Sequence, residues 1–208
     1  MADEQPISKR LRDRRFHIVT GKGGVGKTTV AAILAKRFAL SGHRTLVCEF
    51  NSQEQLAHMM GLSAVGPELK KVDDMLWAVN INPETALAEY GLMKLRYRAF
   101  YQLVFNHPLV HSLIKFVPGM NDLVMLGKAF NHERERNAEG LPSWDRIVID
   151  APASGHGLTL FRLPKIIKEA VPRGNMHRET ADMWSLLVDH KRTAVHIVTL
   201  PESLPAQE

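Results

Sequence analysis

A glycine-rich turn between a strand pattern and a helix pattern constrains this chain more than any other feature. The stretch FHIVTGKGGVGKTTVAAILAKRF occupies residues 16–38, and Gly21, Gly26, Lys27 and Thr28 have the phosphate-loop spacing G-x-x-x-x-G-K-[ST]. A loop that holds polyphosphate points backbone N–H groups inward, so glycines take unusual conformations and a helix begins at once. The sequence therefore predicts a nucleotide site.

Each polar side chain of this loop has a predicted contact. Lys27 is expected to reach the β- and γ-phosphates, Thr28 to place its hydroxyl on Mg²⁺, and Thr29 to bond the α-phosphate. An apolar strand that ends in Asp150 is a Walker-B pattern, whose carboxylate would hold Mg²⁺ through water. The residues expected to contact the cofactor are Gly21, Gly23, Gly24, Val25, Gly26, Lys27, Thr28 and Thr29.

Strand patterns alternate with helix patterns along the chain. The predicted strands are residues 16–20, 44–50 and 77–82, with two more beginning at Asp145 and Thr193, and the first helix spans 28–40 and ends at Gly42. This order predicts an α/β fold with a doubly wound, mainly parallel sheet. Residues 83–137 read as a helical insertion that includes Met93, Met120 and Met125, which leaves 15–82 and 138–208 as the nucleotide-binding domain.

The rest of the sequence excludes several classes of protein. No apolar run is long enough to span a bilayer and the N-terminus lacks a secretory signal, so we expect a cytoplasmic protein. The single cysteine, Cys48, fits a buried strand. The basic run KRLRDRR lacks interleaved aromatic residues, so residues 1–14 read as a solvated leader and no nucleic acid is expected. His107 and His111 share a helix face but have no third ligand for a metal.

The second lysine of the loop, Lys22, points to a particular class of nucleotide-binding protein. The loop has its donors without Lys22, and GKGGVGKTT resembles the deviant Walker A sequence of a family of dimeric ATPases. That resemblance implies ATP as the cofactor and a signature lysine that reaches the partner's nucleotide. Lys22 would then stabilise charge on the phosphates in trans, as an arginine finger does elsewhere. A lysine paired with a local carboxylate is the alternative.

A second segment narrows the resemblance to one family. The residues WDRIVIDAPASGHGLTLFRLP, numbered 144–164, are similar to switch II of the arsenite-pump and tail-anchored-protein-targeting ATPases, also called anion-transporting ATPases. In that family an aspartate leads through A-P to Gly-His and a helix that ends in Leu-Pro, which places Gly155 and His156 at the nucleotide. The resemblance implies a dimeric ATPase with a helical surface for an apolar or membrane-protein client.

The sequence departs from that family at switch I. Where the family has an aspartate that orients the attacking water, this chain has Asn51, whose amide can orient water but cannot take its proton. Glu49 lies on the same strand face and could supply a carboxylate, so Lys22, Lys27, Asn51 and Glu49 are the predicted catalytic residues and hydrolysis is expected to be slow. The arsenite-binding cysteines and the zinc C-x-x-C pair of relatives are absent, which argues against arsenite transport and against a dimer clipped by zinc.

The chain also stops earlier than the family pattern. Relatives continue beyond the position of Glu208 with loops that hold the adenine base, so we expect a C-terminally truncated chain with an incomplete base pocket. If the strand that begins at Thr193 lies beside the first strand, it would form an unprotected sheet edge.

The sequence therefore predicts an ATP-dependent dimeric switch that couples nucleotide state to a helical surface. Two alternatives stay open. One is a hydrolysis-impaired subunit that forms a heterodimer with an active relative, for which Asn51 is the indication. The other is a surface-organising ATPase of the partition or septum-site kind, for which only the basic run at residues 9–15 qualifies.

Overall fold

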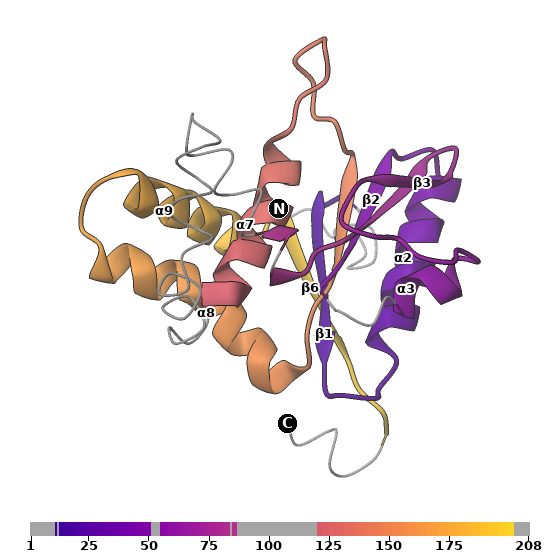
Figure 1. Ribbon diagram of the computed structural model, residues 1–208, viewed down its shortest axis with the longest axis horizontal. Helices are drawn as coiled ribbons and strands as arrows, with labels where there is room; N and C mark the ends of the chain where they lie inside the picture. The colour runs from indigo at the N-terminus through magenta and orange to yellow at the C-terminus, as the bar shows by residue number, and fades with distance from the viewer. Residues whose placement is uncertain (1–10, 12, 51–54, 84, 87–119, 202–208) are drawn as a thin grey trace, which may run out of the picture.

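The computed structural model describes residue 11 and the ranges 13–50, 55–83, 85–86 and 120–201, without the side chains of residues 120–122 and 154–159 (Figure 1). Asn51, Met93, His107 and His111 lie outside the described residues, as do most of the leader and the range 87–119. The boundaries predicted for the leader, the nucleotide-binding domain and the insertion therefore stay predictions.

A sheet of six strands in the order β3-β4-β2-β5-β1-β6 forms the centre of the molecule. β1 (Phe16–Gly21) pairs in parallel with β5 (Arg146–Asp150) and with β6 (Thr193–Val198). β2 (Thr45–Glu49) pairs in parallel with β5 and with β4 (Leu76–Asn80). This arrangement confirms the predicted α/β fold with a doubly wound, mainly parallel sheet.

The antiparallel edge strand β3 (Lys70–Asp73) is the strand that the sequence did not predict. Half-buried and exposed residues alternate along its sequence KKVD, which lacks the apolar run of a strand covered on both faces. Its pairing with β4 completes the sheet on that side, and charged side chains at an edge discourage pairing with another chain.

Helices cover both faces of the sheet (Figure 1). α2 (Lys27–Leu40) and the short α3 (Gln55–Met59) lie on one face, while α7 (Met120–Arg134), α8 (Ser154–Ala170) and α9 (Asn175–Val188) lie on the other. Gly42, with a φ of 84°, follows the end of α2 and donates its N–H to the carbonyl of Ala39. The predicted glycine stop of this helix is therefore confirmed.

Successive residues of the central strands contribute to two separate cores. On β5, Ile147 and Ile149 pack with α7, α8 and α9, whereas Val148 packs with α2 and α3. Alternation of this kind buries both faces of a parallel strand, at about 1.5–3 kcal/mol for each large apolar side chain. Helix α7, which lies within the predicted insertion, contributes buried Leu126 and Phe130 to the first core and so belongs to the layer that covers the sheet.

The strand β6 is the outer strand beside β1, as expected for the strand that begins at Thr193. Two of its β-branched apolar residues are exposed, Val195 at 53% and Ile197 at 77%, on the face that carries α8 and α9 elsewhere in the sheet. Beyond Ala194, every residue of this edge strand is therefore exposed or half-buried.

A buried carboxylate forms ion pairs with two arginines that lie just before β1 and β6. These contacts are at the end of the sheet opposite the phosphate loop. Glu133, near the end of α7, accepts hydrogen bonds on Oε1 from Arg192 at 2.7 Å and from Arg15 at 3.4 Å. Arg15 also donates to the carbonyls of Glu133 and Trp144. The last arginine of the basic run is thus part of the folded structure rather than of a free basic surface.

Two histidines connect β1 to the edge strand β6. The Nε2 atom of His17 lies 2.7 Å from the Arg14 carbonyl oxygen, so this nitrogen donates, and Nδ1 accepts from His196 Nε2 at 3.0 Å. His17 has no exposed surface, and its burial lowers its pKa from 6.5 to about 3. The same cause lowers the pKa of His196. The pair therefore stays neutral in the folded protein.

Because the folded state excludes a proton that unfolded His17 binds, we expect the protein to lose stability in acid. The contribution is fully present above the unfolded pKa of 6.5 and falls by about 1.4 kcal/mol for each pH unit below it, which gives about 2 kcal/mol near pH 5. Urea unfolding near pH 7.5 and near pH 5 would measure this slope. His17→Gln is expected to flatten it, and the exposed His190→Gln should not. An equal slope in His17→Gln would contradict the assignment.

Candidate nucleotide-binding site

The carboxyl ends of the central parallel strands meet at one edge of the sheet. The register places Asp150 of β5 beside Val19 of β1 and beside Glu49 of β2. The phosphate loop, residues 21–27, follows β1 directly at this edge. In open parallel sheets this edge is where ligands bind, so the fold brings together the loop and the acidic residues that are far apart in the sequence.

The loop ends in a glycine that starts α2 without a side-chain cap. Gly26 is the N-cap of α2, with a φ of 89°, and as a glycine it offers the first N–H groups of the helix no side-chain cap. Gly24 also lies in the left-handed region, with a φ of 81°. Gly23 has no positive φ, so the unusual backbone conformation predicted for the loop glycines is not found at this position. Uncapped N–H groups at the positive end of a helix favour an anion.

Gly21 is needed for a different reason, the close approach of the edge strand. Its φ is 148°, and a Cβ atom at this position would collide with the backbone carbonyl of Val198 on β6. Gly21 therefore lets β6 run alongside the start of the loop, so the shape of the loop depends on a strand at the other end of the chain.

The predicted polar side chains converge beside this loop. Lys27 donates from Nζ to the carbonyl of Lys22 at 2.9 Å, and the Thr28 hydroxyl bonds the Asp150 carboxylate. Together with residues 151–153 they line a polar hollow of about 250 Å³. The structure thus brings Lys27, Thr28 and Asp150 into one site, although they come from α2 and β5.

The carboxylate of Asp150 fits a cation. Asp150 is 5% exposed, and its Oδ1 atom is buried without a hydrogen-bond partner among the described residues. Burial raises its pKa to about 6, while the Thr28 hydrogen bond lowers the pKa and the nearby Glu49 carboxylate raises it. A buried carboxylate with an open oxygen next to a threonine hydroxyl is the donor set that Mg²⁺ takes in phosphate-loop sites.

The remaining predicted residues occupy distinct places. Lys22 is half-buried in the loop, Val25 is buried, and Thr29 is exposed in the first turn of α2. Gly155 and His156 lie in the first turn of α8, directly after the residues that line the hollow, and their side chains are outside the description. Asn51 lies outside the described residues.

Glu49 has a setting that differs from the expected one. The sequence predicts a carboxylate that could act on water, yet Glu49 has no exposed surface. Its Oε1 atom accepts the N–H of Leu56 at 3.0 Å, and its Oε2 atom accepts the side-chain amide of Asn80 at 3.1 Å. This geometry favours a positioning role over direct contact with a reacting water.

Sequence reasoning missed some residues around the site. Phe50, Gln55 and Pro152 line the hollow, and Asn80 holds the Glu49 carboxylate. Their positions depend on strand order, because β4 and β5 flank β2 in space but not in sequence. Only the A-P pair after Asp150 gave a signal in the sequence.

Comparison with known proteins identifies the family that carries this arrangement. Residues 14–183 match the family described as anion-transporting ATPase, which covers the phosphate loop, Asp150 and the described helices as far as Met183 in α9. The chain belongs to the anion-transporting ATPase family. Two elements of the anion-transporting ATPase sequence pattern, the loop and the segment after Asp150, are the ones that meet at the site described above.

Several relatives extend the comparison. The chain is 30% identical to the ATPase BagA of Mycobacterium tuberculosis over 204 residues, which is 96% of this chain and 60% of that protein. It is also 30% identical to the ATPase GET3B of Arabidopsis thaliana, over 76% of this chain and 42% of that one. The ATPase ASNA1 homolog 2 of Paramecium tetraurelia is 30% identical over 80% of this chain and 50% of its own length. The chain thus spans about 60% of the length of its mycobacterial relative.

Within the described part of the chain, no cluster of three or more histidine, cysteine, aspartate or glutamate side chains is arranged to hold a metal ion. None of the described helices has both the length and the apolar character that crossing a bilayer requires.

The raised pKa of Asp150 predicts a cost to stability that the site imposes. Below the unfolded pKa of 3.8, Asp150 is protonated in both states and does not lower the free energy of unfolding. As the pH rises from 3.8 through about 6, its ionisation is held back in the folded state, and the free energy of unfolding falls by about 3 kcal/mol. In EDTA without nucleotide, Asp150→Asn should therefore be more stable than wild type near pH 8, with the gap closing toward pH 4. Urea unfolding measures both. Asp182→Asn is the exposed control, and a less stable Asp150→Asn near pH 8 would contradict the prediction.

Proposed function

We propose that this chain binds MgATP and hydrolyses it slowly, and that it acts as a dimeric switch. The observation that carries the proposal is the open oxygen of buried Asp150 beside the Thr28 hydroxyl, at the foot of a phosphate loop whose helix begins without a side-chain cap. A buried carboxylate oxygen without a hydrogen-bond partner is costly, and such a cost is typical of a functional site.

The loop residues have complementary roles in holding the nucleotide. The backbone of residues 23–26 and the start of α2 bind the phosphates, and Lys27 reaches the β- and γ-phosphates after leaving the Lys22 carbonyl. Thr29, exposed at the first turn of α2, bonds the α-phosphate. Thr28 and Asp150 hold Mg²⁺, which neutralises charge on the phosphates when it is bound.

Lys22 acts on the nucleotide of a partner subunit. It follows Gly21 directly in the loop and is half-buried, so part of its surface is open to a second subunit that meets the site. A second copy of the chain placed against this edge would bring its own lysine to the phosphates, which is the role of an arginine finger. The sequence of the loop, with a lysine directly after Gly21, supports this arrangement.

Slow hydrolysis follows from the acidic groups near the site. Asn51 cannot accept a proton from water, and the Glu49 carboxylate is buried and engaged by backbone and side-chain donors. The proposed rate enhancement therefore rests on positioning and on charge stabilisation by Lys22, Lys27 and Mg²⁺ rather than on a strong general base.

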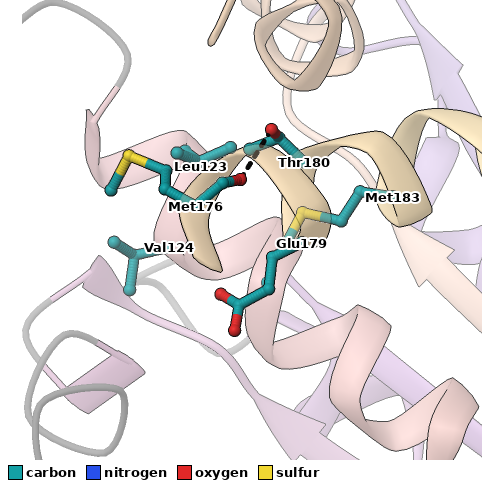
Figure 2. A pocket seen from close by; sticks show the side chains of 7 residues that line it. Leu123, Val124, Met176, Glu179, Thr180 and Met183 are labelled. Carbon is teal, nitrogen blue, oxygen red and sulfur yellow. Dashed lines mark hydrogen bonds between the residues drawn. The ribbon is translucent and has the colours of Figure 1, made fainter. Parts of the chain in front are cut away.

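An apolar client would be held by the helical layer. α7 and α9 form a groove lined by Leu123, Val124, Met176 and Met183, with Glu179 at its edge (Figure 2). Thr180 bonds the Met176 carbonyl at 2.8 Å and so satisfies its own hydroxyl. The groove encloses only about 40 Å³, so a client must widen it. Methionine side chains suit such adaptation.

Binding of nucleotide by this chain is the first property to test. With Mg-ADP or Mg-ATP at about a hundredfold excess over the dissociation constant, linkage predicts a stabilisation of about 2.7 kcal/mol. Thermal unfolding measures it, and Lys27→Ala should abolish the shift. Lys36→Ala, an exposed lysine change on the same helix, is the control and should keep it. A shift of equal size in Lys27→Ala would contradict the assignment of the site.

Complementation between variants tests the contribution of Lys22 in trans. Lys22→Ala keeps its nucleotide site but lacks the lysine that serves the partner, and Lys27→Ala lacks the site but retains Lys22. Each variant alone should be inactive, whereas an equimolar mixture should recover about a quarter of wild-type turnover, because half of the random dimers contain one complete site of two. Wild-type turnover by Lys22→Ala alone would exclude the role, and activity only after mixing with a related ATPase would favour a heterodimer.

A further inference from the structure

The buried carboxylate of Glu49 joins three segments beside the nucleotide site. It ends β2, opposite Asp150 on one side and Asn80 on the other. Its two oxygens accept hydrogen bonds from Leu56, in the first turn of α3, and from the side-chain amide of Asn80. Because a buried carboxylate must be hydrogen-bonded and such charge-assisted bonds are strong, these segments hold fixed positions relative to one another.

Asn80 continues this set of contacts away from the site. Its side chain is 2% exposed, and its backbone N–H donates to the carbonyl of Gly66 at 2.8 Å. Gly66 lies in the loop that connects α3 to β3, with a φ of 75° that other residues rarely adopt. The position of this loop therefore depends on the same asparagine that holds Glu49.

The next residue of that loop contacts α7. Lys128, in the middle of α7, donates from Nζ to the carbonyl of Pro67 at 2.9 Å. Lys128 is only 9% exposed, which is unusual for a lysine. Its charge is also close to β2, because it partly opposes the rise that burial causes in the pKa of Cys48.

We propose that these contacts form one buried connection, defined here as Glu49, Asn80, the backbone of residues 66–67 and Lys128, that couples the nucleotide site to helix α7. Glu49 is the positioning residue at the site end. The inference rests on the proposed function, because it assigns the path by which nucleotide state reaches the helical layer. α7 forms one wall of the apolar groove, so the connection ends where a client would bind.

Repulsion between two neighbouring carboxylates makes this connection sensitive to the binding of a cation. Glu49 and Asp150 lie side by side in register on adjacent strands, and the Glu49 charge acts on the Asp150 carboxyl. A cation held by Asp150 would relieve the repulsion between the two carboxylates. The hydrogen bonds of Glu49 to α3 and Asn80 would then readjust, and a contiguous set of packed polar contacts carries such a change.

Hydrogen exchange of α7 tests the far end of the connection. In wild type, saturating Mg-ADP should change the exchange of backbone amides in residues 120–134 by about fivefold or more. Lys128→Met, which keeps the length of the side chain but removes its donor, should lose this change while its thermal shift with Mg-ADP stays as in wild type. Lys128→Arg should retain the change, and Lys36→Met is the surface control.

Exchanging the carboxylate of Glu49 with the amide of Asn80 tests the connection where it meets the nucleotide site. Glu49→Gln alone should lower kcat more than it raises KM for ATP and should lose the α7 response. The double variant Glu49→Gln with Asn80→Asp restores an amide facing a carboxylate, so it should recover kcat, while the α7 response returns only in part because a neutral amide then lies beside Asp150. A carboxylate that acted directly on water would not be replaced by one at position 80, so recovery separates positioning from direct catalysis.

The outcomes separate this inference from the function on which it rests. A wild-type protein without a nucleotide-induced thermal shift would overturn the proposed function and the inference with it. A normal thermal shift without a change in α7 exchange, or an unchanged α7 response in Lys128→Met, would overturn only the connection. Failure of the double variant to recover either property would show that Glu49 is not part of the connection.

Discussion

Burial of the central parallel strands on both faces is the constraint on which the rest of the structure depends. β1, β2 and β5 alternate their apolar side chains between two cores, so helices must cover both faces of the sheet. Parallel pairing then brings the carboxyl ends of these strands to the same edge. The phosphate loop, Glu49 and Asp150 meet there because the strands that carry them are neighbours.

The site that results conflicts with local stability. Asp150 is buried with an open oxygen beside another buried carboxylate, and the loop depends on glycine backbone at Gly21 and Gly26. Such groups persist when the surrounding sheet holds them in place. Here the sheet is anchored at its opposite end by the ion pairs of Glu133 with Arg15 and Arg192, far from the site.

The two helical layers differ in what they can transmit. α2 begins at the phosphate loop and is therefore part of the site itself. The layer of α7, α8 and α9 meets the site through α8, which starts just after Asp150, and through the buried contact of Lys128 with the loop at Pro67. The proposed switch needs at least one such path, because none of the residues that line the groove between α7 and α9 belongs to the phosphate loop.

The sequence by itself determined the fold class, the phosphate loop and the roles expected of Lys27, Thr28 and Asp150, because these signals are local: spacing, glycine and apolar alternation. For the strand beginning at Thr193, the sequence left the edge position conditional on its lying beside the first strand, which the structure shows. The tertiary structure decided the polar edge strand β3, the need for glycine at Gly21 beside Val198, and the burial of Glu49 against Asn80. Each of these depends on which strands become neighbours. Strand order places residues far apart in the chain within hydrogen-bond distance, and no local pattern encodes that.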